Sequence, residues 1–194
     1  MNWMKKVAVA LVCLLPLGLQ AAKVDTLQVK SPSMNKSIEV VVVSPDVAAT
    51  KACPVIYLLH GYGGNARTWV GIKPDLPKIA DEKGIFFVCP DGKNTWYWDS
   101  PLNADVRYET FISNELVKYV DSHYKTVADR KGRAITGLSM GGHGAMWNGL
   151  RHSDVFSAAG STSGGVDIRP FPKNWEMSVQ IGEKAKYPEN WEKY

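Results

Sequence analysis

The sequence predicts an α/β fold in which a mostly parallel sheet carries helices on both faces. Continuously apolar runs at residues 54–59, 85–89 and 134–138 have the composition of strands buried on both faces. Apolar residues at helical spacing in residues 75–83 and 105–124 predict amphipathic helices between these strands. Because strand and helix alternate along the chain, we expect a parallel sheet with helices packed on its faces.

Further elements are weaker but consistent with this arrangement. The β-branched run at residues 37–44 and the alternating pattern at 24–29 predict an antiparallel strand pair at a sheet edge. Residues 157–163, rich in small side chains, predict a weak fourth parallel strand, and residues 142–150 a third helix. The 194 residues, 45% hydrophobic and 22% charged, fit one domain.

The N-terminus has the pattern of a secretory signal. Six residues that include Lys5 and Lys6 precede a 13-residue apolar stretch, and small residues follow, which predicts a leader of residues 1–21 cleaved after Ala21. A membrane span needs about 20 apolar residues, so no stable membrane insertion is expected after cleavage. Val12 stands before Cys13 where a lipoprotein signal requires a small residue. We therefore expect an exported, periplasmic or extracellular domain of residues 22–194.

Charge and cysteine content add two expectations. The formal charge of +4 is spread along the chain and becomes 21 − 19 = +2 without the leader, so no nucleic-acid partner is predicted. Cys53 opens one predicted strand and Cys89 closes the next, about 20 Å away at about 3.3 Å per residue. A disulfide needs Cα atoms within about 7 Å, so two free, buried thiols are expected.

The strongest functional motif is Gly137-Leu138-Ser139-Met140-Gly141, which matches G-x-S-x-G. It follows a predicted strand and precedes a predicted helix, as a nucleophile elbow requires. This tight turn would hold the Ser139 hydroxyl clear of the backbone, where helix N-terminal amides favour developing negative charge. Ser139 is therefore the predicted nucleophile. A glycine-rich turn in a non-catalytic α/β protein is the alternative.

A second glycine-rich motif, residues 59–65, follows the first buried strand. Its glycines let the backbone curl toward the nucleophile and present an amide. We predict that the amides of Tyr62 and Met140 form an oxyanion hole, in which each donor contributes about 3 kcal/mol in known enzymes. A phosphate cradle is the alternative for this motif alone, but no G-K-[ST] follows, which excludes a P-loop.

Four segments together give the sequence a family resemblance, and they are L-L-H-G-Y-G-G-N (58–65), C-P-D-G (89–92), W-Y-W-D-S (96–100) and G-L-S-M-G-G-H-G-A (137–145). From about Val41 to its end, the chain resembles the esterase D/S-formylglutathione hydrolase-like esterases, which include feruloyl, acetyl-xylan and tributyrin esterases and mycolyltransferases. The resemblance implies an α/β-hydrolase three-layer sandwich with Ser139 as nucleophile. It also implies oxyanion amides from Tyr62 and Met140, and a W-Y-W-D-S segment that lines the cleft.

The aromatic run Trp96-Tyr97-Trp98 allows two interpretations. Neighbouring side chains point in different directions, so at least one is expected to be exposed or to line the cleft. It could stack on a sugar or aromatic acyl group, or cap the edge of the core. The residues predicted to contact substrate are Gly61, Trp96, Trp98 and His143.

The sequence offers no usable catalytic histidine. In this fold the acid and then the histidine follow the serine along the chain. His143 lies on the helix that follows Ser139 and is expected to pack beside the cleft. His152 is 13 residues beyond Ser139, about 20 Å along a helix. His60 is expected to form structural hydrogen bonds, and His123 to lie at a helix end.

The acid of a triad is also missing from the pattern. Asp154 and Asp167 follow Ser139, but neither has a histidine to orient. The end of the chain at residues 187–194 resembles a helix cut short, and a complete fold would need about 60–90 further residues. We therefore expect a C-terminally incomplete chain with little activity and an apolar sheet edge prone to aggregation.

These observations predict an exported serine carboxylic-ester hydrolase that forms an acyl-enzyme on Ser139. Export favours a small-molecule or polysaccharide substrate, such as acetyl or feruloyl esters, over a cytosolic thioester. No metal or cofactor is implied. The alternatives are an inactive fragment or carbohydrate-binding remnant, and an acyltransferase of the same fold.

Overall fold

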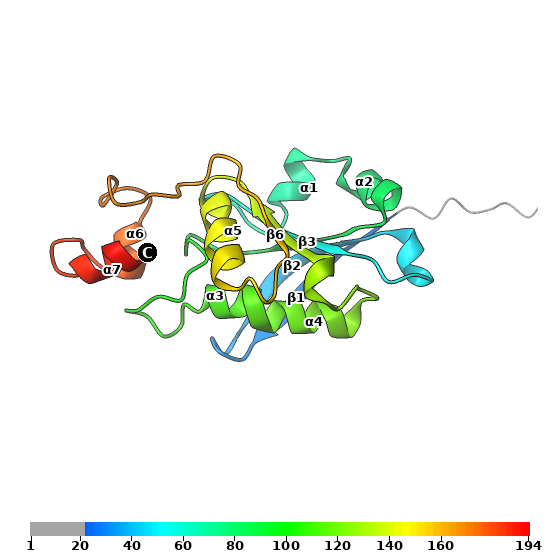
Figure 1. The fold of residues 1–194 in the computed structure, drawn as a ribbon, viewed down its shortest axis with the longest axis horizontal. Helices are drawn as coiled ribbons and strands as arrows, with labels where there is room; N and C mark the ends of the chain where they lie inside the picture. The colour runs from blue at the N-terminus through cyan, green and yellow to red at the C-terminus, as the bar shows by residue number, and fades with distance from the viewer. Residues whose placement is uncertain (1–21) are drawn as a thin grey trace, which may run out of the picture.

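The computed structural model describes residues 22–194, and the predicted leader, residues 1–21, lies outside this range. Six strands form one sheet in the order β1-β2-β4-β3-β5-β6 (Figure 1). Their bounds are Lys23–Ser31 (β1), Lys36–Ser44 (β2), Val55–Leu59 (β3), Phe86–Pro90 (β4), Arg133–Gly137 (β5) and Ala158–Ala159 (β6). The predicted edge pair is confirmed, because β1 and β2 run antiparallel along their whole length. β2 is antiparallel to β4, and the pairs β4–β3, β3–β5 and β5–β6 are parallel.

Helices cover both faces of this sheet, as predicted. The helices are Thr68–Ile72 (α1), Leu76–Lys83 (α2), Tyr108–Thr110 (α3), Leu116–His123 (α4), Met140–Arg151 (α5), Met177–Ile181 (α6) and Pro188–Lys193 (α7). α1 and α2 pack with Val41, Val43 and Phe87 on one face. On the other face, α3, α4 and α5 pack with the side chains that alternate with these, among them Val42 and Val88. Figure 1 shows α1 and α2 on the side of the sheet opposite α3 and α4.

Three predicted elements differ in detail. The strand expected at residues 157–163 is reduced to β6 and one isolated bridge between Leu138 and Thr162, because its small, exposed side chains bury little surface. The helix expected over 105–124 begins at Tyr108 and contains a π-helical segment, Phe111–Glu115. α5 begins at Met140, two residues earlier than expected, directly after Ser139.

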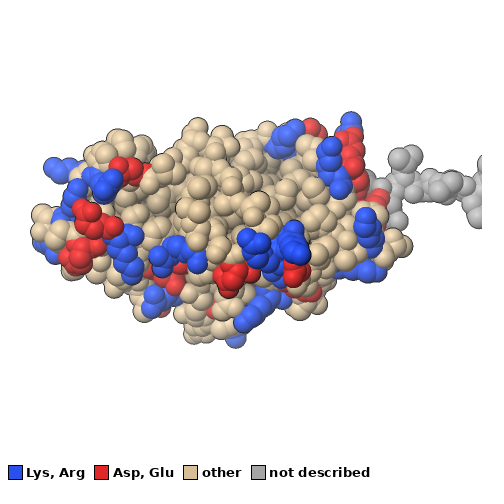
Figure 2. All heavy atoms as spheres, in the orientation of Figure 1, with Lys and Arg blue, Asp and Glu red and all other residues tan. Residues whose placement is uncertain are grey.

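The predictions on cysteines and charge can be compared with the structure directly. Cys53 and Cys89 are free and buried, as predicted. On the face shown in Figure 2, basic and acidic side chains are interspersed at both ends and across the lower half, and the upper central part has no charged side chains. Within residues 22–194, no helix has the length and apolar character needed to cross a membrane.

Candidate active site

Ser139 lies on a sharp turn between the end of β5 and the start of α5. Its φ of 52° and ψ of −120° are a strained conformation for a residue with a side chain. The Ser139 amide donates a hydrogen bond of 2.8 Å to the Thr162 carbonyl, which fixes the turn against the strand that follows. The residue is exposed and lines a cleft, so its hydroxyl is open to a ligand, as the elbow motif predicts.

The glycines of the motif are required by contact with the neighbouring backbone. A Cβ on Gly137 would lie 2.3 Å from the Gly141 carbonyl oxygen. A Cβ on Gly141 would lie 2.2 Å from the Leu59 carbonyl oxygen, at the end of the adjacent strand β3. Any side chain at either position would therefore push the elbow away from the sheet.

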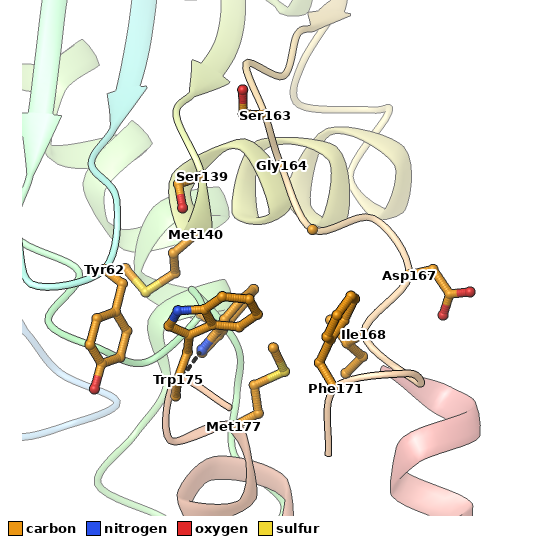
Figure 3. Close-up of a pocket in the computed structure, with 12 residues that line it drawn as sticks. Tyr62, Ser139, Met140, Ser163, Gly164, Asp167, Ile168, Phe171, Trp175 and Met177 are labelled. Atoms are coloured by element: carbon orange, nitrogen blue, oxygen red, sulfur yellow. Dashed lines mark hydrogen bonds between the residues drawn. The ribbon is translucent and has the colours of Figure 1, made fainter. Parts of the chain in front are cut away.

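The two predicted oxyanion donors lie beside this serine. Tyr62 and Met140 line the same cleft as Ser139 (Figure 3). Among the described residues, no hydrogen bond occupies either of their backbone amides, although the Ser139 and Gly141 amides are both bonded to carbonyls. Free amides at a cleft surface are available to an oxyanion, and the role of these two as an oxyanion hole stays a prediction.

The opposite wall of the cleft comes from the chain after β6. The cleft has a volume of about 220 Å³, and the residues of this wall are Ser163, Gly164, Gly165, Asp167, Ile168, Phe171, Trp175 and Met177. Phe171 and Trp175 are 44% and 49% exposed, so the wall presents aromatic surface toward the serine. Asp167 points away from Ser139 in Figure 3 and is paired with Arg169, which lowers the pKa of its carboxyl group.

The expectation for the aromatic run is only partly confirmed. Trp96 lines the cleft, as expected for at least one of the three. However, Trp96, Tyr97 and Trp98 are all buried, with 4%, 0% and 0% exposure. Successive side chains do not alternate in direction here, because Trp96 and Tyr97 have positive φ angles of 59° and 60°, which turn them inward. Trp98 therefore lies behind the cleft wall, and the prediction that it contacts substrate is wrong.

His143 is also placed behind the cleft. It is 4% exposed, and its Nδ1 lies 2.6 Å from the Gly165 carbonyl oxygen. The Trp98 indole N–H donates to its Nε2 at 2.9 Å, so the hydrogen-bond network assigns the proton to Nδ1. Burial lowers the pKa of His143 to about 4. With both ring nitrogens engaged, it packs beside the cleft as expected and neither acts as a base nor contacts substrate.

The other three histidines are engaged elsewhere. His60 is the structural hydrogen bonder that the sequence predicts, since its Nδ1 lies 2.7 Å from the Gly61 carbonyl oxygen. His152 Nε2 lies 2.9 Å from a carboxylate oxygen of Glu109. His123 Nδ1 lies 2.8 Å from the backbone carbonyl oxygen of Tyr119, in the same helix. None of the four histidines in the chain forms a hydrogen bond with Ser139 Oγ in the structure.

The loop between β3 and α1 contains two of the predicted site residues, Gly61 and Tyr62. Gly61 is buried against Leu138 and does not line the cleft, so the prediction that it contacts substrate is wrong. The Tyr62 phenol is 38% exposed, and Glu176, which lies beside it, raises the pKa of the phenol. The loop containing Tyr62 therefore approaches the segment that forms the opposite wall.

No pattern in the sequence predicted the cleft wall that lies opposite Ser139. Ile168, Phe171, Trp175 and Met177 follow no motif and are spread over an irregular segment. The only signal in the sequence is the aromatic and apolar character of these residues in a stretch without strand or helix periodicity. The position of Trp175 depends on its contact with Trp96, which is distant in the chain.

A hydroxyl on a strand-to-helix elbow, beside two free backbone amides at the carboxyl edge of the sheet, is the arrangement typical of the serine hydrolase family with the α/β-hydrolase fold. The chain belongs to the family described as "Putative esterase", whose model matches residues 31–194.

Individual relatives agree with this assignment. An esterase of Mycobacterium tuberculosis is 30% identical over 149 residues, which are 73% of this chain and 32% of that protein. An acetyl esterase of Caldicellulosiruptor saccharolyticus is 32% identical over 102 residues, 52% of this chain and 37% of that protein. A solved ferulic acid esterase superposes with a TM-score of 0.70 at 30% identity, covering 86% of this chain and 71% of its own. The matched region thus spans about a third of the two curated relatives.

Proposed function

We propose that this chain carries the nucleophile and oxyanion hole of an exported serine carboxylic-ester hydrolase. The observation that supports it most is the strained, exposed Ser139 beside the free amides of Tyr62 and Met140. Ser139 Oγ would attack the ester carbonyl carbon and pass its proton to solvent water, because no histidine of the chain forms a hydrogen bond with it, and the departing alcohol would take up a proton from water. The two amides would hold the oxyanion until the carbon–oxygen bond to the alcohol breaks. Water would then release the acid from the acyl-enzyme.

Polysaccharide side-chain esters are the substrates we propose for it. Its relatives include an acetyl esterase and a ferulic acid esterase. The cleft volume of about 220 Å³ is below the 300–1,000 Å³ typical of drug-sized ligand sites, which suits a small acyl group with the alcohol outside. The exposed rings of Phe171 and Trp175 suit a flat acyl group as well as an acetyl group.

Labelling of the full chain with a fluorophosphonate tests the nucleophile. Wild type should be labelled at Ser139, and Ser139→Ala should not. Because no histidine contacts Ser139 Oγ, turnover of 4-nitrophenyl acetate or a feruloyl ester should be slow, as in triad knock-outs that lose about 10⁴- to 10⁶-fold. No labelling of a folded wild-type sample would contradict the hydrolase and favour a carbohydrate-binding role. An N-terminus other than Ala22 on the exported protein would contradict the proposed leader.

A further inference from the structure

The amide of Tyr62 can stabilise an oxyanion only if its direction is fixed. Tyr62 lies in the loop between β3 and α1, and its exposed ring gives it little packing of its own. A trans peptide unit is planar, so the N–H of Tyr62 points opposite to the C=O of Gly61. Whatever holds the Gly61 carbonyl therefore also aims the Tyr62 amide.

His60 holds that carbonyl from inside the fold, and the Gly64 amide also donates to it, at 3.0 Å. The His60 Nδ1 lies 2.7 Å from the Gly61 oxygen, and its Nε2 accepts the Gly92 amide hydrogen at 2.9 Å, which leaves the proton on Nδ1 for donation. The ring is 1% exposed. The Tyr97 hydroxyl donates to the His60 carbonyl at 3.1 Å, so the backbone at the start of the loop is also fixed.

Asn94 holds the next peptide unit. Its Oδ1 accepts the Gly63 amide hydrogen at 2.9 Å, and Gly63 has a positive φ of 74°. Asn94 comes from the segment after β4, and its own backbone carbonyl lies 3.4 Å from Gln180 Nε2. Asn94 does not line the cleft that contains Ser139. The two peptide units that flank Tyr62 are therefore each held by a side chain from outside the Tyr62–Gly63 turn.

We propose that Asn94, acting with His60, is a positioning residue that sets the direction of the Tyr62 amide in the oxyanion hole. This inference rests on the proposed function, because it takes the Tyr62 amide as an oxyanion donor. The role of Asn94 depends on its side-chain oxygen Oδ1. The other contact, from Gln180 to the Asn94 backbone carbonyl, is kept in any substitution. The residue is partly exposed, so replacing it should not unfold the domain.

The rate of Ser139 phosphonylation by a fluorophosphonate tests this role. In that reaction Oγ bonds to phosphorus, the hydroxyl proton passes to solvent water, fluoride leaves, and the phosphoryl oxygen occupies the oxyanion hole. We expect Asn94→Ala to slow the saturated labelling rate by between about tenfold and a hundredfold, less than the 10²–10³ lost with a whole donor. The half-saturating probe concentration should stay unchanged, because the cleft walls are intact. Asn94→Asp, which keeps the acceptor, should label within about threefold of wild type.

The outcomes separate this inference from the proposed function. Asn94→Ala labelling as fast as wild type overturns the positioning role, and so does equal slowing in Asn94→Asp. If wild type itself is not labelled, the hydrolase proposal fails, and amide hydrogen exchange decides the positioning role. Faster exchange at Gly63, whose amide is bonded to Asn94, in Asn94→Ala but not in Asn94→Asp supports the positioning role, and unchanged exchange in Asn94→Ala overturns it.

Discussion

The wall that carries Ser139 and the wall that carries Phe171 and Trp175 face each other across the cleft but are fixed in different ways. The first wall directly follows the ends of two parallel strands, where Leu59 at the end of β3 is paired with Gly137 at the end of β5. The second comes from residues 163–177, a stretch without strand or α-helix before Met177.

The second wall depends on a few side-chain contacts with distant parts of the chain. His143 Nδ1 meets the Gly165 carbonyl at 2.6 Å, and the Trp96 indole donates to the Trp175 carbonyl at 3.1 Å. The Ser100 hydroxyl donates to the Gln180 carbonyl at 2.5 Å. Backbone geometry therefore fixes the position of Ser139, the site of the proposed reaction. Side-chain contacts, which single substitutions can remove, fix the shape of the opposite wall of the cleft.

The largest effect is expected at the first wall, from Gly141→Ala. The added Cβ would meet the Leu59 carbonyl oxygen at 2.2 Å, and neither backbone can move without breaking the pairing of β3 with β5. We expect the free energy of unfolding to fall by about 3–5 kcal/mol, as in other severe cases. Urea unfolding followed by circular dichroism measures it.

Gly71→Ala is the matched control for this substitution. Gly71 lies in helix α1, and a Cβ there would meet nothing within 4 Å. Alanine should stabilise the helix by roughly 0.5–1 kcal/mol. A loss at Gly141→Ala no larger than 1 kcal/mol would show that the elbow is not held by backbone contact.

The second wall should be sensitive to pH through His143. Burial lowers its pKa to about 4 in the folded chain, against 6.5 for an ordinary histidine. Unfolding therefore takes up a proton between pH 6.5 and 4, so the free energy of unfolding falls as pH falls through this window and levels off below it. The full loss should be about 3 kcal/mol, and urea unfolding followed by tryptophan fluorescence at each pH measures it.

His143→Gln separates this contribution from the titration of carboxylates. The glutamine amide can donate to the Gly165 carbonyl and accept from the Trp98 indole, but it does not titrate. The difference in stability between wild type and this variant should narrow or reverse as pH falls from 6.5 to 4. A difference that stays constant with pH would mean that His143 is not buried as a neutral ring.

The difference between the two walls of the cleft also determines what could be predicted from the sequence. The sheet, the helices on both faces, the elbow at Ser139 and the two amides follow from local patterns such as residues 54–59 and the G-x-S-x-G motif. Glycine permits tight turns and close backbone contacts that a side chain would block, and β-branched residues favour strands, so the consequences of both are visible without the fold.

The parts that sequence missed depend on tertiary contacts. Alternation predicts that at least one of three neighbouring aromatics is exposed or lines the cleft. Trp96 does line it, but the positive φ angles of Trp96 and Tyr97 leave all three rings buried. The place of Trp175 depends on its carbonyl meeting the Trp96 indole, 79 residues earlier in the chain. No local pattern encodes either feature.

The smallest change in stability is expected from Trp175→Ala, which probes the second wall alone. The Trp175 ring is 49% exposed, and its carbonyl, which holds Trp96, remains in the variant, so stability should change by less than about 1 kcal/mol. Loss of the ring should raise the half-saturating concentration of an aromatic fluorophosphonate by up to about tenfold, since an aromatic pair contributes about 0.5–1.5 kcal/mol. The saturated labelling rate and the response to a small alkyl probe should not change. Val179→Ala, in helix α6 and outside the cleft, is the control and should alter none of these values. An equal loss for alkyl and aromatic probes in Trp175→Ala would show that the second wall acts on the elbow and does not only shape the ligand site.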